Sequence, residues 1–165
     1  MLRQPCSADV PMAMELSTDP YVPATGSLPA EADEAEALAW VQRQRDRHSE
    51  GTGFSFIIAD KNTDEALGSC GLWLRQLETG RASAGYSIRP SARRRGLAVE
   101  ALSALTSFGW SIPALHRIEL YIEPWNIASI RTAERCGYAR KGLLRSHQEI
   151  AGGRRDMLIY AAIRP

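Results

Sequence analysis

The stretch SIRPSARRRGLAVEA, from Ser87 to Ala101, reads as the end of a strand, then a turn, then the start of a helix. A helix start carries unpaired backbone N–H groups and a partial positive charge, and both favour a phosphate. Gly96 lets a ligand approach the backbone closely because it has no Cβ. The side chains of Arg93, Arg94 and Arg95 add charges that pair with phosphate oxygens. This stretch alone leaves two interpretations open, a pyrophosphate-binding turn or a solvated basic helix start.

The composition is that of an ordinary domain rather than of a nucleic-acid or membrane protein. The 165 residues are 44% hydrophobic and 24% charged, with a formal net charge of +1. We therefore expect a single domain over residues 1–165, with no nucleic-acid partner and no membrane attachment. Cys6, Cys70 and Cys136 are widely spaced and odd in number, which predicts no metal site and a reducing compartment. No apolar run typical of a signal peptide opens the chain, so the predicted location is cytoplasmic.

The segments before Ser87 predict two helices and a run of antiparallel strands. Phe54, Phe56 and Ile58 alternate along one face, which is strand periodicity. Residues 18–30 are rich in proline and are expected to form a loop that borders a substrate site. The predicted elements are a short strand within 1–6, a helix over 10–17 capped by Asp9, a helix over 31–48, and strands over 54–59, 67–77 and 82–88.

The segments after Ser87 alternate helix and strand. We expect a helix over 91–108, a strand over 116–122, a helix from Asn126 to Cys136, and strands over 138–150 and 156–162. Asn126 suits a helix N-cap, and Gly137 suits the left-handed residue after a helix. The strand–helix–strand unit implies one parallel strand pair. The expected fold class is therefore α/β, a mostly antiparallel mixed sheet with flanking helices.

With these elements placed, the chain resembles the GCN5-related N-acetyltransferase (GNAT) superfamily. Its acetyl-CoA signature is Gln or Arg, two residues, Gly, one residue, and Gly or Ala, which RRRGLA at Arg93–Ala98 matches. The block NIASIRTAERCGY at Asn126–Tyr138 is similar to that of the branch containing the ribosomal-protein alanine and serine N-acetyltransferases. The resemblance covers about residues 54–162. It implies a GNAT-like acyl-CoA N-acyltransferase fold in which the parallel strands splay apart.

The resemblance also implies direct transfer of the acetyl group from acetyl-CoA, a co-substrate, to a primary amine, with no metal. The backbone N–H groups of about Arg94–Ala98, with Leu97 among them, would hold the pyrophosphate. Ser87, Ile88 and Arg89 would pair their free backbone groups with the pantetheine arm, as an added strand does. A backbone N–H near Ile88 would also polarise the thioester carbonyl.

Two residues of the later block are expected to act on the cofactor. In the resembled branch the residue matching Ser129 helps the thiolate leave, and the residue matching Asn126 contacts the pantetheine arm. A hydroxyl can donate one hydrogen bond to developing negative charge. The alternative interpretation is structural, because Asn126 and Ser129 also suit the first turn of a helix.

The general base is less clearly marked. Many acetyltransferases outside this branch carry a tyrosine acid where this chain has Ala133. Some members of the branch carry a glutamate base where this chain has Gln148, flanked by His147 and Glu149. Strand alternation places His147 and Glu149 on one face, and either is a candidate base, with solvated surface residues as the alternative. Because the sequence marks a base only weakly, an α-amine or another amine of low pKa is the favoured acceptor, since an α-amine is about 10–15% neutral at pH 7 and lysine only about 0.04%.

Other functions remain as alternatives at this stage. One is a regulatory domain that binds CoA without catalysis, and another is a nucleic-acid binder that uses Arg93–Arg95, which the low net charge disfavours. The acceptor is an amine, either a protein N-terminus or a small molecule. A monomer and a homodimer are both compatible with the sequence.

Overall fold

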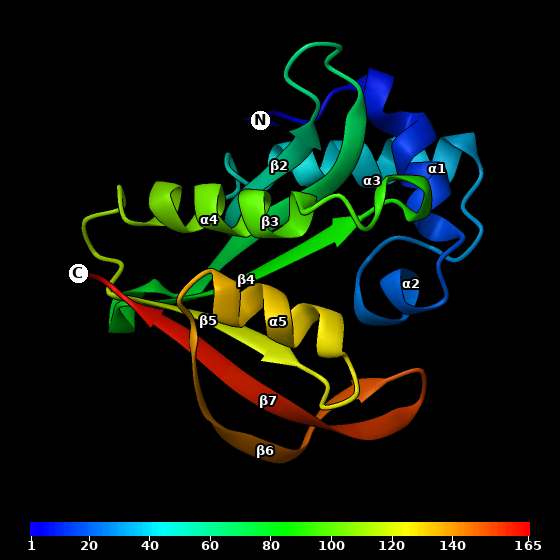
Figure 1. Cartoon of the computed structure of the whole chain (residues 1–165). Helices are drawn as coiled ribbons and strands as arrows, with labels where there is room; N and C mark the ends of the chain where they lie inside the picture. The colour runs from blue at the N-terminus through cyan, green and yellow to red at the C-terminus, as the bar shows by residue number, and fades with distance from the viewer.

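A seven-stranded sheet runs through the centre of the computed structural model, which describes residues 1–165 (Figure 1). The strand order is β1-β2-β3-β4-β5-β7-β6. The strands are β1 (Leu2–Arg3), β2 (Gly53–Ala59), β3 (Ala66–Gln76), β4 (Arg81–Ile88), β5 (Arg117–Ile122), β6 (Ala139–Ile150) and β7 (Gly153–Ile163). The helices are α1 (Val10–Ser17), α2 (Tyr21–Thr25), α3 (Glu34–Asp46), α4 (Leu97–Gly109) and α5 (Ile127–Arg135). This mixed sheet with flanking helices confirms the predicted fold class.

The pair β4 and β5 is the only parallel one, and it is short. The two strands are in register from Arg81 opposite Arg117 to Ser83 opposite Glu119, and they do not pair beyond that point. Figure 1 shows them diverging toward the side where α2 lies. Every other neighbouring pair of strands is antiparallel. The predicted splayed pair is therefore confirmed, and the sheet opens at the carboxyl end of β4.

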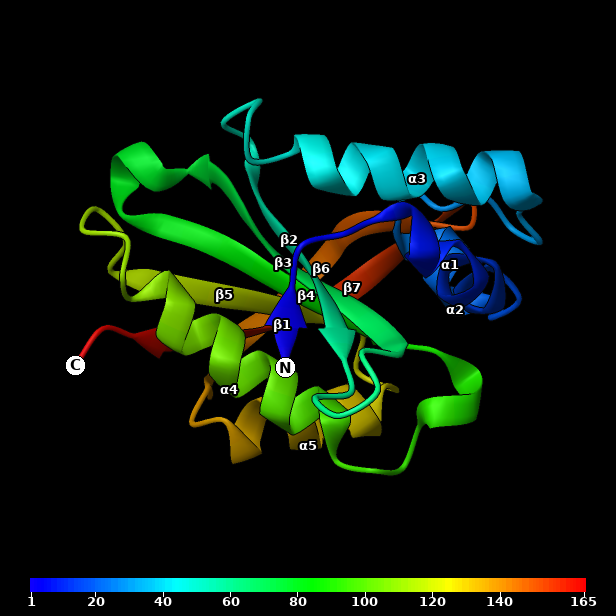
Figure 2. The ribbon, with the colours of Figure 1, turned by 90° about the horizontal axis from the view of Figure 1, so that it is seen from above.

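The helices cover both faces of the sheet, as the view in Figure 2 shows. α3 packs over β2 and α1 over β3, and Ile57 and Ala59 of β2 join the apolar cluster of these helices. On the other face α4 packs over β3 and β4, with Leu102 and Leu105 fully buried. Neighbouring positions of one strand therefore face two different apolar layers, because strand side chains alternate.

Local sequence accounts for where α3 and α5 begin and for where α5 ends. Asp33 begins α3 with a capping box, since its side chain accepts from the N–H of Glu36 and that of Glu36 accepts from the N–H of Asp33. Asn126 caps α5 by accepting from the N–H of Ser129 at 3.1 Å. Gly137 follows α5 at φ +78°, the left-handed conformation that glycine adopts without strain. The predicted cap and stop of α5 are both confirmed.

The structure corrects two predictions in the first thirty residues. The region 18–30 was expected to be a loop, but it contains α2. Asp19 begins this helix by accepting from the N–H groups of Tyr21 and Val22, and Pro23 is tolerated because it lies in the first turn. Asp9 does not cap α1. Its buried carboxylate instead pairs with Arg3.

Three element boundaries also differ from the predictions. The helix expected from Ser91 begins at Leu97, because Pro90–Ala92 forms a 3₁₀ turn and Arg93 is extended at ψ 168°. The last strand begins at Gly153 rather than Asp156, since the glycine turn is tight enough for pairing to start at once. The helix expected from Glu31 begins three residues later, at Glu34, directly after its Asp33 cap.

Candidate active site

The turn between β4 and α4 presents a row of backbone donors. Arg94 and Gly96 have φ values of +64° and +79°, so the chain twists twice before α4 begins. None of the five N–H groups of Arg94–Ala98 has a hydrogen-bond acceptor within the protein. A Cβ built on Gly96 would meet nothing within 4 Å, so the space in front of this turn is open. Such a concave row of N–H groups at a helix start fits an anion, including the diphosphate of a nucleotide cofactor.

The arginines around this turn divide into two groups. Arg89 pairs with Glu15 and Glu65, and Arg93 donates from Nε to the carbonyl of Ile88 at 3.0 Å. Both guanidinium groups are thus engaged within the protein. Arg94 and Arg95 are exposed and form no ion pair, so their charges are available to a ligand.

The opening between β4 and β5 contains a cavity of about 310 Å³. Its lining includes the chain from Ser83 to Tyr86, which has no partner strand on the β5 side beyond Ser83. Ser87 and Ile88 continue the same unpaired edge toward the turn between β4 and α4, which contains Arg93–Arg95 and is called the arginine turn below. A free strand edge offers N–H and C=O groups to an extended ligand that carries amides.

The predicted residues of α5 lie at this cavity. Asn126 and Ser129 both line it. Tyr86 reaches the same place from β4, and its hydroxyl is buried without a hydrogen-bond partner. Burial raises the pKa of Tyr86, and the neighbouring hydroxyls of Ser129 and Thr132 act in the opposite direction. The cavity therefore contains two adjacent hydroxyl groups that can donate to a leaving group.

The two candidate bases do not reach the cavity. His147 and Glu149 are exposed, and His147 stacks on Tyr121 with ring centres 5.1 Å apart. Gln148 points the other way, as strand alternation predicts, and lines the cavity. No Asp, Glu, His or Lys lines this cavity at all. Two buried carboxylates lie close behind its wall: Glu119, which accepts from the Tyr121 hydroxyl at 2.8 Å, and Glu123 just after β5, which pairs with Arg155 at 3.8 Å.

α2 and the start of α5 meet at one wall of this cavity. The rings of Tyr21 and Trp125 pack edge to face, with centres 5.0 Å apart. Burial and then the Glu123 carboxylate raise the pKa of Tyr21 well above its usual value. Tyr21 is therefore neutral at physiological pH and extends the polar wall formed by Asn126 and Ser129.

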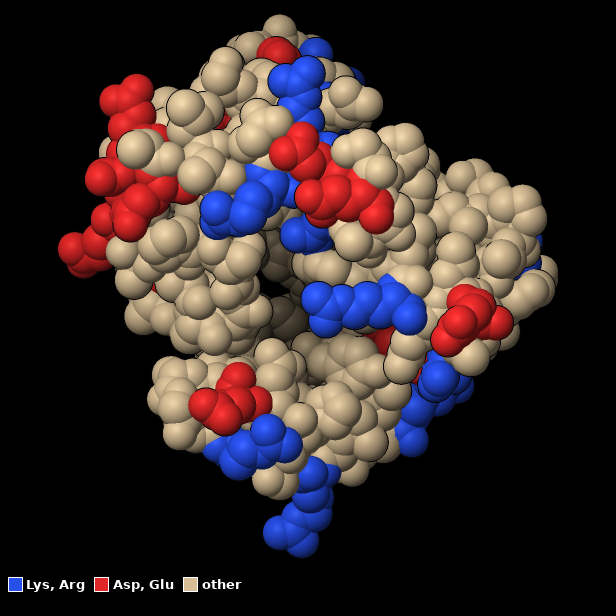
Figure 3. Space-filling model, turned by 180° about the vertical axis from the view of Figure 1, so that it is seen from behind, with Lys and Arg blue, Asp and Glu red and all other residues tan.

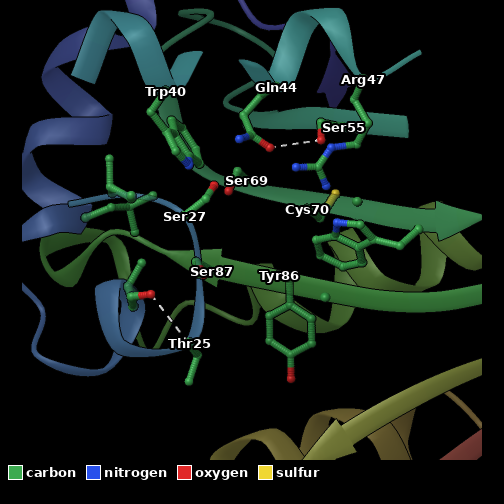
Figure 4. Close-up of a pocket in the computed structure, with 17 residues that line it drawn as sticks. Thr25, Ser27, Trp40, Gln44, Arg47, Ser55, Ser69, Cys70, Tyr86 and Ser87 are labelled. Atoms are coloured by element: carbon green, nitrogen blue, oxygen red, sulfur yellow. Dashed lines mark hydrogen bonds between the residues drawn. The ribbon is translucent and has the colours of Figure 1, made fainter. Parts of the chain in front are cut away.

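A second cavity of about 190 Å³ adjoins the first on the α3 face of the sheet. Trp73, Gly85, Tyr86 and Thr25 line both cavities, so the two spaces share one wall. Figure 4 shows Trp40, Gln44 and Arg47 of α3 directed over β3 into this second cavity. Figure 3 shows that the face seen from behind is hollowed near its centre, with basic side chains on the border.

The sequence prediction did not include Tyr86 or Arg47. Tyr86 stands one position before the predicted Ser87, but the matched family motif begins only at Arg93, so nothing marked it. Arg47 falls within the helix predicted over 31–48, but no motif marked it as a functional residue. The only signal that could have found it was its place in α3 one turn after Gln44, on a face that is otherwise buried.

The structure contains no group of three or more His, Cys, Asp or Glu side chains placed to hold a metal ion. None of its helices combines the length and the apolar character that crossing a membrane requires. Burial raises the pKa of the Cys70 thiol to about 12, so this cysteine is an inert core residue.

Comparison with known proteins places these features in a family. A family model described as "Acetyltransferase (GNAT) domain" matches residues 1–139. The Bacillus licheniformis "Uncharacterized N-acetyltransferase p20" is 30% identical over 156 residues, 94% of this chain and 88% of that relative.

Two solved structures have the same fold. The ribosomal L7/L12 alpha-N-protein acetyltransferase RimL in complex with coenzyme A superposes with a TM-score of 0.83 at 21% identity, covering 98% of this chain and 92% of its own. The spermidine N-acetyltransferase from Vibrio cholerae in complex with CoA and spermine gives 0.79 at 17% identity, covering 99% and 94%.

Proposed function

This chain belongs to the GNAT acetyltransferase family and is an acetyl-CoA-dependent N-acetyltransferase, and we propose how its residues divide the work of that reaction. The five free N–H groups of Arg94–Ala98 hold the diphosphate of acetyl-CoA, and the side chains of Arg94 and Arg95 add charge. Arg89 and Arg93 support this turn through their internal pairs rather than by contact with phosphate. The observation that carries the proposal is that this donor row directly follows the strand edge that has lost its partner.

The unpaired edge of β4 binds the pantetheine arm. Ser87 and Ile88 lie between the arginine turn and the cavity. A pantetheine arm that pairs with them would therefore lead from the diphosphate into the opening between β4 and β5. Acetyl-CoA supplies an activated acetyl thioester. The hydroxyls of Ser129 and Tyr86 donate hydrogen bonds to the sulfur as it leaves, and Asn126 contacts the arm while capping α5.

The acceptor amine enters from the adjoining cavity and is acetylated directly. Neither cavity is lined by a carboxylate, an imidazole or a lysine amine. An acceptor that is already partly neutral at pH 7 needs no such base, and an α-amine meets this condition far better than a lysine side chain. RimL acts on a protein α-amine and the Vibrio cholerae enzyme on spermidine, so the fold accommodates both classes. The absence of a base favours the α-amine here.

The test is a pair of matched substitutions at left-handed glycines. Gly96→Glu places a carboxylate in the proposed diphosphate site, so acetyl-CoA binding measured by titration calorimetry should fall below detection. Gly152→Glu has the same backbone strain, since Gly152 has φ +75° and also faces open space, but it lies in the β6–β7 turn. It should bind acetyl-CoA like the unmodified protein. Retained affinity in Gly96→Glu would overturn the assignment of the turn.

A further inference from the structure

The second cavity has an unusual distribution of charge. Of the 17 residues that line it, Arg47 is the only charged one. Its floor is made of small side chains on one face of three neighbouring strands: Ser55, Ser69, Gly71, Gly85 and Ser87. Its opposite wall is the face of α3 that carries Trp40, Gln44 and Arg47 (Figure 4). One cation therefore faces a hollow that contains no acidic group.

The Arg47 guanidinium has no ionic or hydrogen-bonding partner. Its Nη1 atom is buried and makes no hydrogen bond, and no carboxylate lies within ion-pair distance of the side chain. The guanidinium instead stacks on Trp73, with Cζ 5.1 Å from the ring centre. This stacking leaves the donating edge of the group free, because a guanidinium donates in its own plane.

The other arginines near the site differ from Arg47 in having acidic partners. Arg89 and Arg93 are also partly buried, and each has a carboxylate partner. A buried polar group without a partner costs free energy, and a charged group costs more than a neutral one. Burial, followed by repulsion from Arg75, lowers the pKa of Arg47. Arg47 therefore keeps hydrogen-bonding capacity that no group of the chain uses.

A neighbouring amide adds a second donor. Gln44 accepts from the Ser55 hydroxyl through Oε1 at 3.0 Å, so its Nε2 group remains free to donate. Arg47 is the C-cap residue of α3 and follows Gln44 by three residues, a spacing that places both side chains on the same side of the helix. Arg47 offers the planar fork of N–H groups that matches a carboxylate or a phosphate, and Gln44 adds a separate amide donor on the same wall of the cavity.

We propose that Arg47, assisted by Gln44, binds an anionic group, a carboxylate or a phosphate, on the same acceptor molecule that carries the acetylated amine. The inference rests on the proposed function and adds the class of acceptor to it. Trp73 lines both cavities, so an acceptor held at Arg47 extends past this ring toward Tyr86 and the splay. Polyamines do not fit this class, since they would bring further cations to a cavity without carboxylates.

The experiment compares matched acceptors that differ in one charge. Thiol release from acetyl-CoA is measured with free α-amino acids and their α-amides, with 2-aminoethyl phosphate and ethanolamine, and with spermidine. The anionic member of a pair should be preferred by about 10-fold to 100-fold in kcat/KM, the range expected for a charge-assisted hydrogen-bonded pair. Comparison of the carboxylate and phosphate pairs identifies the source of the anion.

Substitution of Arg47 tests whether its side chain causes the preference for anionic acceptors. Arg47→Gln should raise KM for the anionic acceptor by a similar factor, with little change for its neutral partner or for acetyl-CoA. Arg45→Gln is the control, because Arg45 is exposed on the same helix and makes no ion pair. Equal or better turnover of neutral amines or spermidine by the unmodified protein would overturn the proposal while leaving acetyl transfer intact.

A binding measurement decides the matter when no amine in the set is acetylated. In the presence of CoA, the melting temperature is recorded with increasing amounts of each carboxylate and phosphate compound. A rise that is absent in Arg47→Gln supports the anion site independently of turnover. No rise with any anion overturns it. Failure of acetyl-CoA itself to bind would instead contradict the proposed function of the arginine turn.

Discussion

Arg93 and Asp19 join the two sides of the active site through an ion pair of 2.6 Å. Arg93 is the first residue of the arginine turn, and its Nε also donates to the carbonyl of Ile88 on β4. Asp19 caps α2, the helix that borders both cavities. A single contact therefore connects the turn proposed to hold the donor with the helix that borders the acceptor.

This pair should show measurable coupling. Arg93→Gln and Asp19→Asn are combined in a double-mutant cycle of urea unfolding, which isolates the pairwise free energy. Asp19→Asn keeps a side-chain oxygen for the α2 cap. Because Arg93 is 43% exposed, we expect a coupling of about 0.5–1 kcal/mol at pH 7. An additive cycle would show that the contact does not connect the two sides.

The same coupling should depend on pH. Burial opposes ionisation of Asp19, but hydrogen bonds from Arg93 and from the α2 N–H groups outweigh it and lower its pKa. A lowered folded-state pKa means that the contribution to stability is present above the unfolded pKa and disappears as the pH falls through the folded value. The coupling should therefore be full at pH 7 and be lost below about pH 4. A coupling that persists under strongly acidic conditions would contradict this origin.

Tyr86 should matter for rate but not for stability. Its hydroxyl is buried without a partner, so Tyr86→Phe removes an unsatisfied group, and the melting temperature should be unchanged or higher. If the hydroxyl assists the leaving thiolate, kcat should fall about tenfold or more with little change in KM for acetyl-CoA. Ser129→Ala should act in the same direction. Tyr138→Phe is the matched control, since its hydroxyl hydrogen-bonds Thr106 at 2.7 Å in the core.

The two tyrosine variants should thus differ in opposite ways: Tyr86→Phe should lose kcat, and Tyr138→Phe should lose stability. Tyr138→Phe should lose about 1 kcal/mol of stability with kcat unchanged. If Tyr86→Phe and Ser129→Ala both retain full kcat, neither hydroxyl takes part in the reaction. The leaving group would then be stabilised by backbone donors alone.

Asn126 has a structural and a proposed binding role that substitution can separate. Asn126→Ala removes the α5 cap and should cost about 1 kcal/mol of stability. Asn126→Ser restores a capping oxygen but shortens the side chain. If the amide also contacts the pantetheine arm, Asn126→Ser should recover most of the stability and still show a raised KM for acetyl-CoA. Recovery of both properties would leave the residue with its capping role alone.

Much of the fold was predictable because its signals are local. The alternation of Phe54, Phe56 and Ile58 predicted β2, and Asn126 and Gly137 predicted both ends of α5. The glycine at position 96 predicted a turn open to a ligand, and the structure has it at φ +79° with free space in front. These features depend on backbone geometry within a few residues, which sequence records directly.

The remaining features depend on contacts between segments far apart in the chain. Asp9 looked like a helix cap, but its carboxylate is buried against Arg3. Nothing in the sequence indicated that the Arg89 guanidinium pairs with Glu15 and Glu65. No sequence motif marked Arg47, and only the packing of α3 over the sheet places it in a cavity. Pairing partners of this kind are chosen by tertiary structure, and no periodicity in the sequence reports them.

The alternation of β4 has a consequence for how such an enzyme can change. Gly85 and Ser87 line the second cavity, whereas the Tyr86 side chain points toward Ser129 and Thr132 of α5. A Cβ on Gly85 would come within 2.9 Å of Trp73, the ring on which Arg47 stacks. A methyl group at position 85 would thus change the shape of the second cavity without altering the arginine turn, while the Tyr86 hydroxyl keeps its place beside Ser129.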